Sequence, residues 1–521
     1  NLCLPLGPAE VVLHHVFFLF GLISILFLSL KASNLVGSSY ADGYRLVAFF
    51  DNVGGLKPRA AVRSSGVLVG RVEKIEFDDE IYQAKVFLRV DKDMKFPKDS
   101  SIKVLTAGLL GENYLGIMPG AETEYFIDAD VIEMTQSAII LENIIHTSPD
   151  KVAGFTGDMT NMETMYSLKE FFDKIINSQN LDSRNEKYYI NTSSRSNYIF
   201  NSSIEGIEDS DFILLIGTNP RYEATILNAR IRKTYIKKNL PIYSVGDVGD
   251  LTYPYEFFEN STSVIKDILN NKHELSDKIK KSKKPLIILG KSILKHNSGT
   301  YVFEEIKKYL EKNNLTTDDW NPLNIMSNDA ATVGALDLDI ISKNSSNEIF
   351  DKLEKNEFEI LFLIGQDNLN FKKNKEFIIY IGSHGDKGAS IADVILPSAA
   401  FTEQDGYFTN LEGRLQKAYK ASYPPGEAKE DWEIINDLSL LIKKRKLYDN
   451  KNILIDSMFN FLNLKKNELE NFKVPSYEFI NEKIFVDQID YYHSNVIARA
   501  SKTMSECKNI RMNLPKTGTE G

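Results

Sequence analysis

Three glycine-containing loops hold the residues whose types and spacing could do chemistry. Each loop directly follows an apolar run that does not alternate with polar residues, which indicates a strand covered on both faces. In open α/β sheets, ligands bind where such strands end. The candidate loops are Gly217-Thr218-Asn219-Pro220, Gly290-Lys291-Ser292 and Gly382-Ser383-His384-Gly385-Asp386-Lys387-Gly388.

Two of these loops have simpler explanations than a reaction site. Gly290-Lys291-Ser292 resembles the end of a phosphate-binding P-loop, but Pro285 stands where that loop needs a glycine, so we reject this interpretation. His384 and Asp386 could support acid–base or metal chemistry, yet a glycine-rich turn with a hydrogen-bonded histidine explains them more simply. The sequence holds no GxGxxG after a strand, no HExxH and no GxSxG. We therefore predict no catalytic residue and no metal site.

Composition and charge exclude several classes of function. The chain has 521 residues, of which 43% are hydrophobic and 26% charged, so it is a folded protein of about three domains. A net charge of −10 gives no general attraction for nucleic acid. The two cysteines, Cys3 and Cys507, stand at opposite ends and cannot build an iron–sulfur cluster or a thiolate zinc site within this chain.

The elements that must position the loops alternate between strands and helices. Apolar strands that end in glycine are expected at residues 212–216, 285–289, 359–364 and 377–381, with room for crossover helices between them. The apolar spacing of residues 162–172 predicts an amphipathic helix. This alternation predicts a parallel, doubly wound α/β region over residues 151–440, followed by a helical and tail region over residues 441–521.

Four segments of the α/β region resemble one protein family. They are residues 204–232, 391–397 (IADVILP), 410–414 (NLEGR) and 498–504. The region is similar to the C-terminal, molybdopterin-oxidoreductase-like part of the large iron–sulfur subunit of respiratory complex I, the NADH:quinone oxidoreductase subunit called NuoG in bacteria. The resemblance implies a structural part of an oxidoreductase, with the other complex I peripheral-arm subunits as partners.

The same resemblance gives the first loop a meaning. Gly217-Thr218-Asn219-Pro220 matches the loop that touches a pterin guanine dinucleotide in catalytic relatives. No convincing molybdenum ligand is placed in the chain, so we expect a vestigial pterin-site loop and no bound cofactor. Full-length family members carry iron–sulfur clusters on an N-terminal region, and a different segment stands in that place here. The chain is therefore expected neither to bind NADH nor to relay electrons by itself.

The first part of the chain follows another pattern. Residues 11–30 form an apolar run with the length of a membrane-spanning helix, so we predict a span within residues 1–31. His14 and His15 in this run are best explained as tolerated polar residues near the end of the span. Short alternating runs between turn signals predict a small all-β barrel over residues 40–135.

The predicted barrel resembles the MCE domain of MlaD-type lipid-transport proteins. The resemblance rests on residues 50–58 (FDNVGGLKP), 66–72 (GVLVGRV) and 105–116 (LTAGLLGENYLG). It implies a homo-hexameric ring, a membrane ABC-transporter complex and phospholipid as partners, with Leu109 and Leu110 lining a lipid pore. The alternative is that both leucines cap the barrel core.

Residues 136–150 are expected to hold a truncated helix and the junction between the two patterns. The chain is then a complex I subunit fragment fused to a lipid-transport module, a membrane-anchored phospholipid-transport protein, or an artificial joining of two gene fragments. A single span in a bacterial inner membrane would place the MCE domain in the periplasm, whereas a NuoG-like region belongs on the cytoplasmic side. No second apolar run of about twenty residues separates them, which favours artificial joining.

Overall fold

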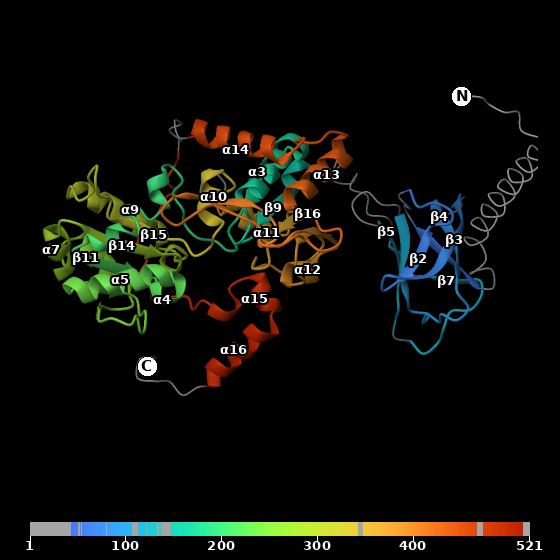
Figure 1. The fold of residues 1–521 in the computed structure, drawn as a ribbon, viewed down its shortest axis with the longest axis horizontal. Helices are drawn as coiled ribbons and strands as arrows, with labels where there is room; N and C mark the ends of the chain where they lie inside the picture. Colours follow the sequence, from blue (N-terminus) through green and yellow to red (C-terminus); the bar gives the residue numbers. More distant parts are fainter. Residues whose placement is uncertain are drawn as a thin grey trace, which may run out of the picture. The chain divides into compact units, whose positions relative to one another are not determined.

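The computed structural model describes residues 43–50, 53, 55–79, 81–106, 113–120, 122–132, 135–136, 147–341, 347–465 and 472–513. The chain divides into two compact units with the boundary between Asn143 and Ile144, inside the predicted junction (Figure 1). Among the described residues, no helix has both the length and the apolar character needed to cross a membrane. The predicted span at residues 11–30 and the pore residues Leu109 and Leu110 lie outside the described residues, so both stay predictions.

The first unit is all-β, as its alternating pattern predicts. Its strands form one sheet in the order β7-β1-β4-β3-β2-β6-β5-β8. Their bounds are β1 Tyr44–Phe50, β2 Ala61–Ser64, β3 Val67–Asp78, β4 Gln83–Val90, β5 Ser101–Thr106, β6 Asn113–Met118, β7 Asp130–Ile132 and β8 Thr135–Gln136. Every second residue of β1, namely Leu46, Ala48 and Phe50, joins one apolar core, because side chains of a strand alternate between its two faces.

The second unit contains two five-stranded sheets. The first sheet has the order β13-β12-β11-β14-β15, and each neighbouring pair of strands is parallel. Its strands are β11 Phe212–Ile216, β12 Ile242–Val245, β13 Glu256–Phe257, β14 Pro285–Gly290 and β15 Leu323–Met326. The switch in strand order falls between β11 and β14, and this is where open parallel sheets bind ligands.

The second sheet repeats this arrangement with strands that are far apart in the sequence. It has the order β10-β9-β16-β17-β18, again with parallel neighbours. Its strands are β9 Val152–Thr156, β10 Leu181–Asp182, β16 Ile360–Ile364, β17 Phe377–Gly382 and β18 Val394–Pro397. The chain leaves this sheet after β10, builds the whole first sheet, and returns at β16.

Helices cover both faces of the sheets and explain why the strands are apolar throughout. In β11, Leu214 and Ile216 pack into one core cluster, whereas Ile213 and Leu215 pack into the cluster on the other face. The helices around the first sheet are α4 Pro220–Glu223, α5 Thr225–Lys238, α6 Thr262–Leu269, α7 Glu274–Lys281, α8 Lys291–Leu294 and α9 Gly299–Lys312. Those around the second sheet are α3 Met162–Phe171 with the π-helix Phe172–Ile176, α10 Thr332–Asp337, α11 Glu348–Glu354, α12 Lys387–Ile391, α13 Asp431–Lys443 and α14 Lys451–Lys465.

The C-terminal part of the second unit wraps over both halves. A two-stranded hairpin, β19 Gly406–Thr409 with β20 Leu415–Ala418, precedes α13, and the predicted boundary at residue 440 falls inside that helix. Residues 472–490 then run over the first half, where Ser261 and Lys483 form a β-bridge. The short helices α15 Val496–Ala500 and α16 Lys502–Asn513 end the described chain.

Candidate functional site

The loops after β11 and β14 lie against each other at the switch point of the first sheet. Gly217 has φ +59°, a conformation that favours glycine, and a Cβ on it would come within 2.8 Å of Ile293 Cβ. A Cβ on Gly290 would come within 2.1 Å of the Gly217 carbonyl oxygen. The switch point is therefore closed by backbone contact.

The second sheet has the same close approach at its own switch point. A Cβ on Gly157, which follows β9, would come within 1.8 Å of the carbonyl oxygen of Gly365, which follows β16. Each half of the unit thus joins its two central strands through a pair of glycines. Neither pair is recognisable as a repeat in the sequence, because one glycine of each pair follows its partner by more than 70 residues.

The polar groups of the predicted pterin-site loop bind residues of this chain. Thr218 Oγ1 donates to Glu223 Oε2 over 3.0 Å, and the Asn219 backbone N–H donates to Glu223 Oε1 over 2.6 Å. Asn219 also donates its side-chain amide to the Val248 carbonyl, and its Oδ1 accepts from the Arg221 N–H. The four residues Gly217, Thr218, Asn219 and Pro220 therefore form a loop with its own carboxylate at the start of α4.

The residues present do not fit a pterin guanine dinucleotide. A dinucleotide places its phosphates on backbone N–H groups at a helix start, and here the Glu223 carboxylate takes that position. Burial raises the pKa of Glu223, and the nearby Asp487 raises it further. A carboxylate and a phosphate would compete for the same donors, and they would repel each other when both are ionised. That the loop binds no cofactor in solution stays a prediction.

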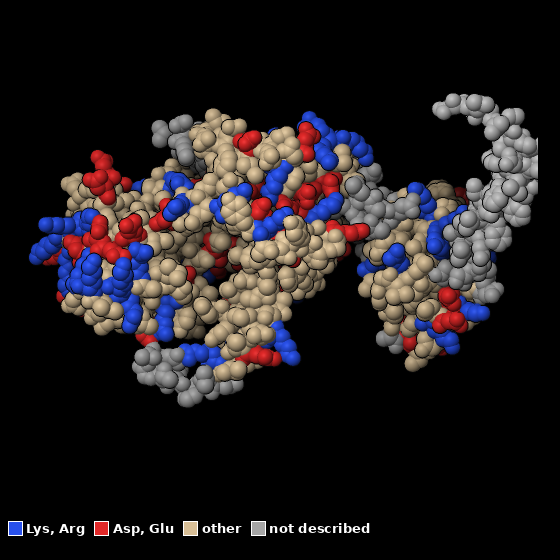
Figure 2. Space-filling view, in the orientation of Figure 1, with Lys and Arg blue, Asp and Glu red and all other residues tan. Residues whose placement is uncertain are grey.

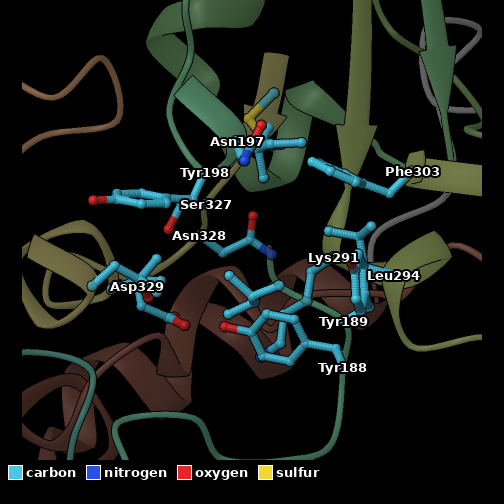
Figure 3. A pocket seen from close by; sticks show the side chains of 15 residues that line it. Tyr188, Tyr189, Asn197, Tyr198, Lys291, Leu294, Phe303, Ser327, Asn328 and Asp329 are labelled. Carbon is cyan, nitrogen blue, oxygen red and sulfur yellow. The ribbon is translucent and has the colours of Figure 1, made fainter. Parts of the chain in front are cut away.

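A pocket lies at the carboxyl end of the first sheet, next to this loop. It encloses about 470 Å³ of empty volume, part of which is open to solvent. Its apolar wall comes from Tyr188, Tyr189, Leu294, Phe303, Ile325 and Leu336, and its polar wall from Asn197, Lys291, Ser327, Asn328 and Asp329. Figure 3 shows these side chains around a common space, with Asn328 near its middle. We refer to this space as the central pocket.

Charged groups from both sheets meet beside the central pocket. Asp158 follows β9, and its side chain accepts a hydrogen bond of 2.6 Å from Asn368, which follows β16. Burial, and then the neighbouring Asp158, raise the pKa of Asp329 to about 7. Lys291 opposes this rise, although its ammonium also binds Asn185 Oδ1 at 2.7 Å and Glu186 at 3.2 Å.

Two buried acceptors on the pocket wall have no hydrogen-bond partner within the described part of the chain. They are Ser327 Oγ and Asn328 Oδ1, which follow β15. Buried polar atoms in proteins are normally hydrogen-bonded, so a polar molecule that enters the pocket would find acceptors there. Asp329 beside them can exchange a proton near neutral pH. The pocket can therefore bind a small polar molecule, but the residues described supply no activated nucleophile.

The other sequence-derived candidates are not brought together. His384 Nδ1 lies 2.9 Å from Ser383 Oγ, and Asp386 pairs with Arg499 of α15. The loop is anchored by Asp367, which accepts from the Gly388 N–H and the Tyr380 hydroxyl. This is the hydrogen-bonded turn favoured by the sequence. Among the described residues, no group of three or more His, Cys, Asp or Glu side chains is placed to hold a metal ion, and Cys507 is exposed.

The sequence pattern does not single out the central pocket. It presents Lys291 only as part of a rejected P-loop, and no motif contains Asp158, Asp329 or Glu223. The available signal is positional, because Asp158 and Asp329 both follow short apolar runs that end as strands. That the two strand ends meet depends on the packing of the sheets, which no local pattern encodes.

Comparison with known proteins agrees with this division of the chain. The family model for molybdopterin oxidoreductase matches residues 138–440, and the model for the MlaD protein matches residues 42–120. One solved structure, the Acinetobacter MlaFEDB complex in an ATP-bound conformation, contains a chain that is 32% identical over 27% of this chain and 97% of that chain. Its TM-score of 0.23 is too low to bear on the fold.

Curated relatives match the second unit. The NADH-ubiquinone oxidoreductase 75 kDa subunit of Reclinomonas americana is 37% identical over 71% of this chain and 57% of the relative. The NuoG protein of the NADH-quinone oxidoreductase of Rickettsia bellii is 35% identical over 73% of this chain and 55% of the relative. The chain therefore spans about half the length of the curated relatives that it matches.

Both resemblances inferred from the sequence are confirmed, since one polypeptide carries an MlaD domain and a region related to NuoG. The matched strands, loops and helices of residues 138–440 cover more than half of the 521 residues. The chain belongs to the molybdopterin oxidoreductase family.

Proposed function

We propose that the second unit is a structural, non-catalytic part of an NADH:quinone oxidoreductase. The observation that carries this proposal is the Glu223 carboxylate, which occupies the helix start where catalytic relatives of the family would hold a phosphate. The glycine contacts at both switch points support it, because they fill the space with backbone. In this role the unit contributes surfaces and stability rather than a reaction.

The partners follow from the relatives. Two of them are named as NADH oxidoreductase subunits, so the partners proposed for the second unit are the other peripheral-arm subunits of complex I. We further propose a bacterial inner-membrane location with a single span at residues 11–30. On this proposal the MlaD domain faces the periplasm and the second unit would need the cytoplasmic side.

Cofactor analysis of the purified full chain tests the structural role. We expect no stoichiometric molybdenum by elemental analysis and no guanosine monophosphate released by acid, because Glu223 holds the phosphate position. The variant Glu223→Gln, which keeps the hydrogen-bonding shape without the charge, serves as a control for electrostatic exclusion. One molybdenum and one guanosine monophosphate per chain in the unsubstituted protein would overturn the proposal.

A second candidate function belongs to the first unit. The MlaD family match at residues 42–120 and the shared apolar core of the barrel favour a lipid-transport module that forms a homo-hexamer and docks on an ABC transporter. Leu109 and Leu110 are the proposed pore lining. Replacing both with asparagine should abolish phospholipid co-purification while hydrogen exchange across residues 43–106 stays unchanged.

The matched control for this test is Ile127→Asn, since Ile127 is 65% exposed on the same unit. This control should retain the lipid. Loss of hydrogen-exchange protection in the leucine variant would instead identify both leucines as core residues, which is the alternative considered from the sequence.

A third interpretation is that two gene fragments have been joined artificially. It is supported by the opposite sides of the membrane that the two modules require. Long-read sequencing of genomic DNA and of transcripts across codons 140 to 155 tests it. A single uninterrupted reading frame in both would overturn this interpretation and favour a genuine fusion.

A further inference from the structure

Helix α5 differs from the other long helices around the first sheet in its outward face. Helices α6, α7 and α9 leave no isoleucine, leucine, valine or phenylalanine side chain fully exposed. In α5, Ile226 is 76% exposed and Ile236 is 66% exposed, and Tyr222 of the preceding α4 is 47% exposed. Single exposed apolar residues are ordinary, so the arrangement of these residues decides whether they form a site.

The exposed residues of α4 and α5 form one continuous row. Tyr222, Ile226, Ala229, Lys233 and Ile236 follow one another at intervals of four, three, four and three residues. Residues at these intervals share one face of a helix and form the seam that a second helix packs against. The opposite face of α5 carries Leu227 and Ile231, which are buried against the first sheet. The helix is therefore apolar on two sides, and one of them is covered. We name the exposed row the α5 seam.

The α5 seam is bordered by positive charge. Helix α5 contains five basic residues and no acidic residue: Arg230, Arg232, Lys233, Lys237 and Lys238. At 100° per residue, Arg232 lies on one side of the seam, and Arg230 and Lys237 lie on the other. Figure 2 shows Lys and Arg side chains gathered over this helix, on a chain whose net charge is −10.

Part of this charge is already balanced by the fold. Glu208 binds Arg230 at 2.7 Å and Lys233 at 2.8 Å, and the Glu208 carbonyl accepts from Lys238. Arg232 Nε donates to the Thr252 carbonyl, which leaves its charge uncompensated. Neither Arg232 nor Lys237 forms an ion pair with a described residue. One uncompensated cation therefore stands on each side of the apolar row.

We infer that the α5 seam docks an amphipathic helix of a partner protein, with an apolar stripe flanked by acidic residues. The heptad-like spacing fits a helix, since an extended strand would match every second residue instead. The flanking cations fit glutamate or aspartate at the edges of that helix, where charges select the partner in helix pairs. A second copy of this chain does not fit, because two α5 helices would bring five positive charges against five.

The inference gives the structural role proposed above a specific contact, and it rests on that role only for the choice of partner. It does not depend on cofactor content, so a cofactor analysis that overturned the structural role would leave the docking experiment intact. Conversely, a seam that binds nothing would leave the Glu223 argument unchanged.

The test uses the full chain and two labelled peptides of three heptads, both with leucine at the two seam positions. One peptide carries glutamate at the flanking positions and the other lysine. Fluorescence anisotropy should show the acidic peptide binding at least about tenfold more tightly than the basic one. The double variant Ile226→Ser/Ile236→Ser should weaken the acidic peptide by at least about tenfold, and Arg232→Glu/Lys237→Glu should reverse the preference between the peptides.

Matched controls separate the seam from general surface effects. Ile395→Ser removes an isoleucine that is 53% exposed on β18, and Lys281→Glu/Lys312→Glu reverses exposed charges on α7 and α9. Both controls should bind the acidic peptide as the unsubstituted chain does. Tryptophan fluorescence verifies that each variant is folded.

Several outcomes would overturn the inference. These are failure of both peptides to bind, equal affinity for the two peptides, or unchanged affinity in the double serine variant. Binding to vesicles of phosphatidylglycerol that is lost in that variant would assign the seam to a membrane surface instead. Concentration-dependent dimerisation that is lost in the same variant would assign it to a second copy of the chain.

Discussion

Replacing Gly217 by alanine tests the close backbone contact at the first switch point. Gly217 has φ +59°, and a Cβ there would meet the Cβ of Ile293 at 2.8 Å and its backbone nitrogen at 2.9 Å. Holding alanine in the left-handed region costs about 1–2 kcal/mol, and forcing an extra methyl into packed surroundings costs about 1–3 kcal/mol more. We therefore expect Gly217→Ala to lower the free energy of unfolding by about 2–5 kcal/mol.

Gly249 provides the matched control for this substitution. Its φ is +64°, nearly the same as that of Gly217, but a Cβ there would meet nothing within 4 Å. Gly249→Ala should therefore cost only the conformational part, about 1–2 kcal/mol. The difference between the two variants isolates the contact between the loops.

Urea unfolding followed by tryptophan fluorescence measures both effects in the right unit. The chain has two tryptophans, Trp320 and Trp432, and both lie in the second unit. Trp320 is buried and donates its Nε1–H to the Pro285 carbonyl at the start of β14, so its emission reports on the sheet that contains Gly217. Equal shifts of the unfolding midpoint in Gly217→Ala and Gly249→Ala would refute the argument that backbone contact closes the switch point.

Three further predictions concern charged groups of the second unit. Asp182→Asn should lower the free energy of unfolding by about 3–5 kcal/mol in the same urea assay, because Asp182 and Arg184 form an ion pair in which both side chains are fully buried. The pKa of Asp329 rises from 3.8 to about 7 on folding, so the folded carboxyl holds its proton more tightly than the unfolded one. The free energy of unfolding should therefore fall as pH rises between these values, and Asp329→Asn should flatten that part of the pH profile. Glu223→Ala leaves Thr218 Oγ1 and the Asn219 N–H without their acceptor and should cost about 1–3 kcal/mol, with Glu223→Gln closer to the unsubstituted chain; equal losses would count against the hydrogen-bonded role of Glu223.

The sequence is informative where a local pattern determines the structure. The unbroken apolar run at residues 212–216 predicts a strand covered on both faces, and its residues do alternate between two core clusters. The alternating residues of β1 predict one face against a core, which is also observed. Both predictions follow from side-chain direction, which depends on the backbone of a few neighbouring residues.

The site is less accessible to sequence reasoning because its parts come from distant segments. The loop at Gly217 is recognisable, but its acceptor Glu223 is not, although it lies only a few residues further on. A carboxylate that folds back onto its own helix start cannot be distinguished by sequence from one that faces solvent. Asp158 and Asp329 come from different sheets, and their proximity depends on how those sheets pack.

The order of strands in the second sheet has a consequence for how the protein is made. β9 pairs with β16, which the ribosome adds about 200 residues later, a delay of roughly 10–40 s at ordinary rates of synthesis. The first sheet lies entirely within that interval and is continuous in sequence, so it can complete its pairing while β9 still waits. During this time the apolar residues of β9 and α3 have no finished sheet to cover them. The nascent chain is therefore most vulnerable to aggregation before residue 364 has emerged, and most in need of a chaperone there.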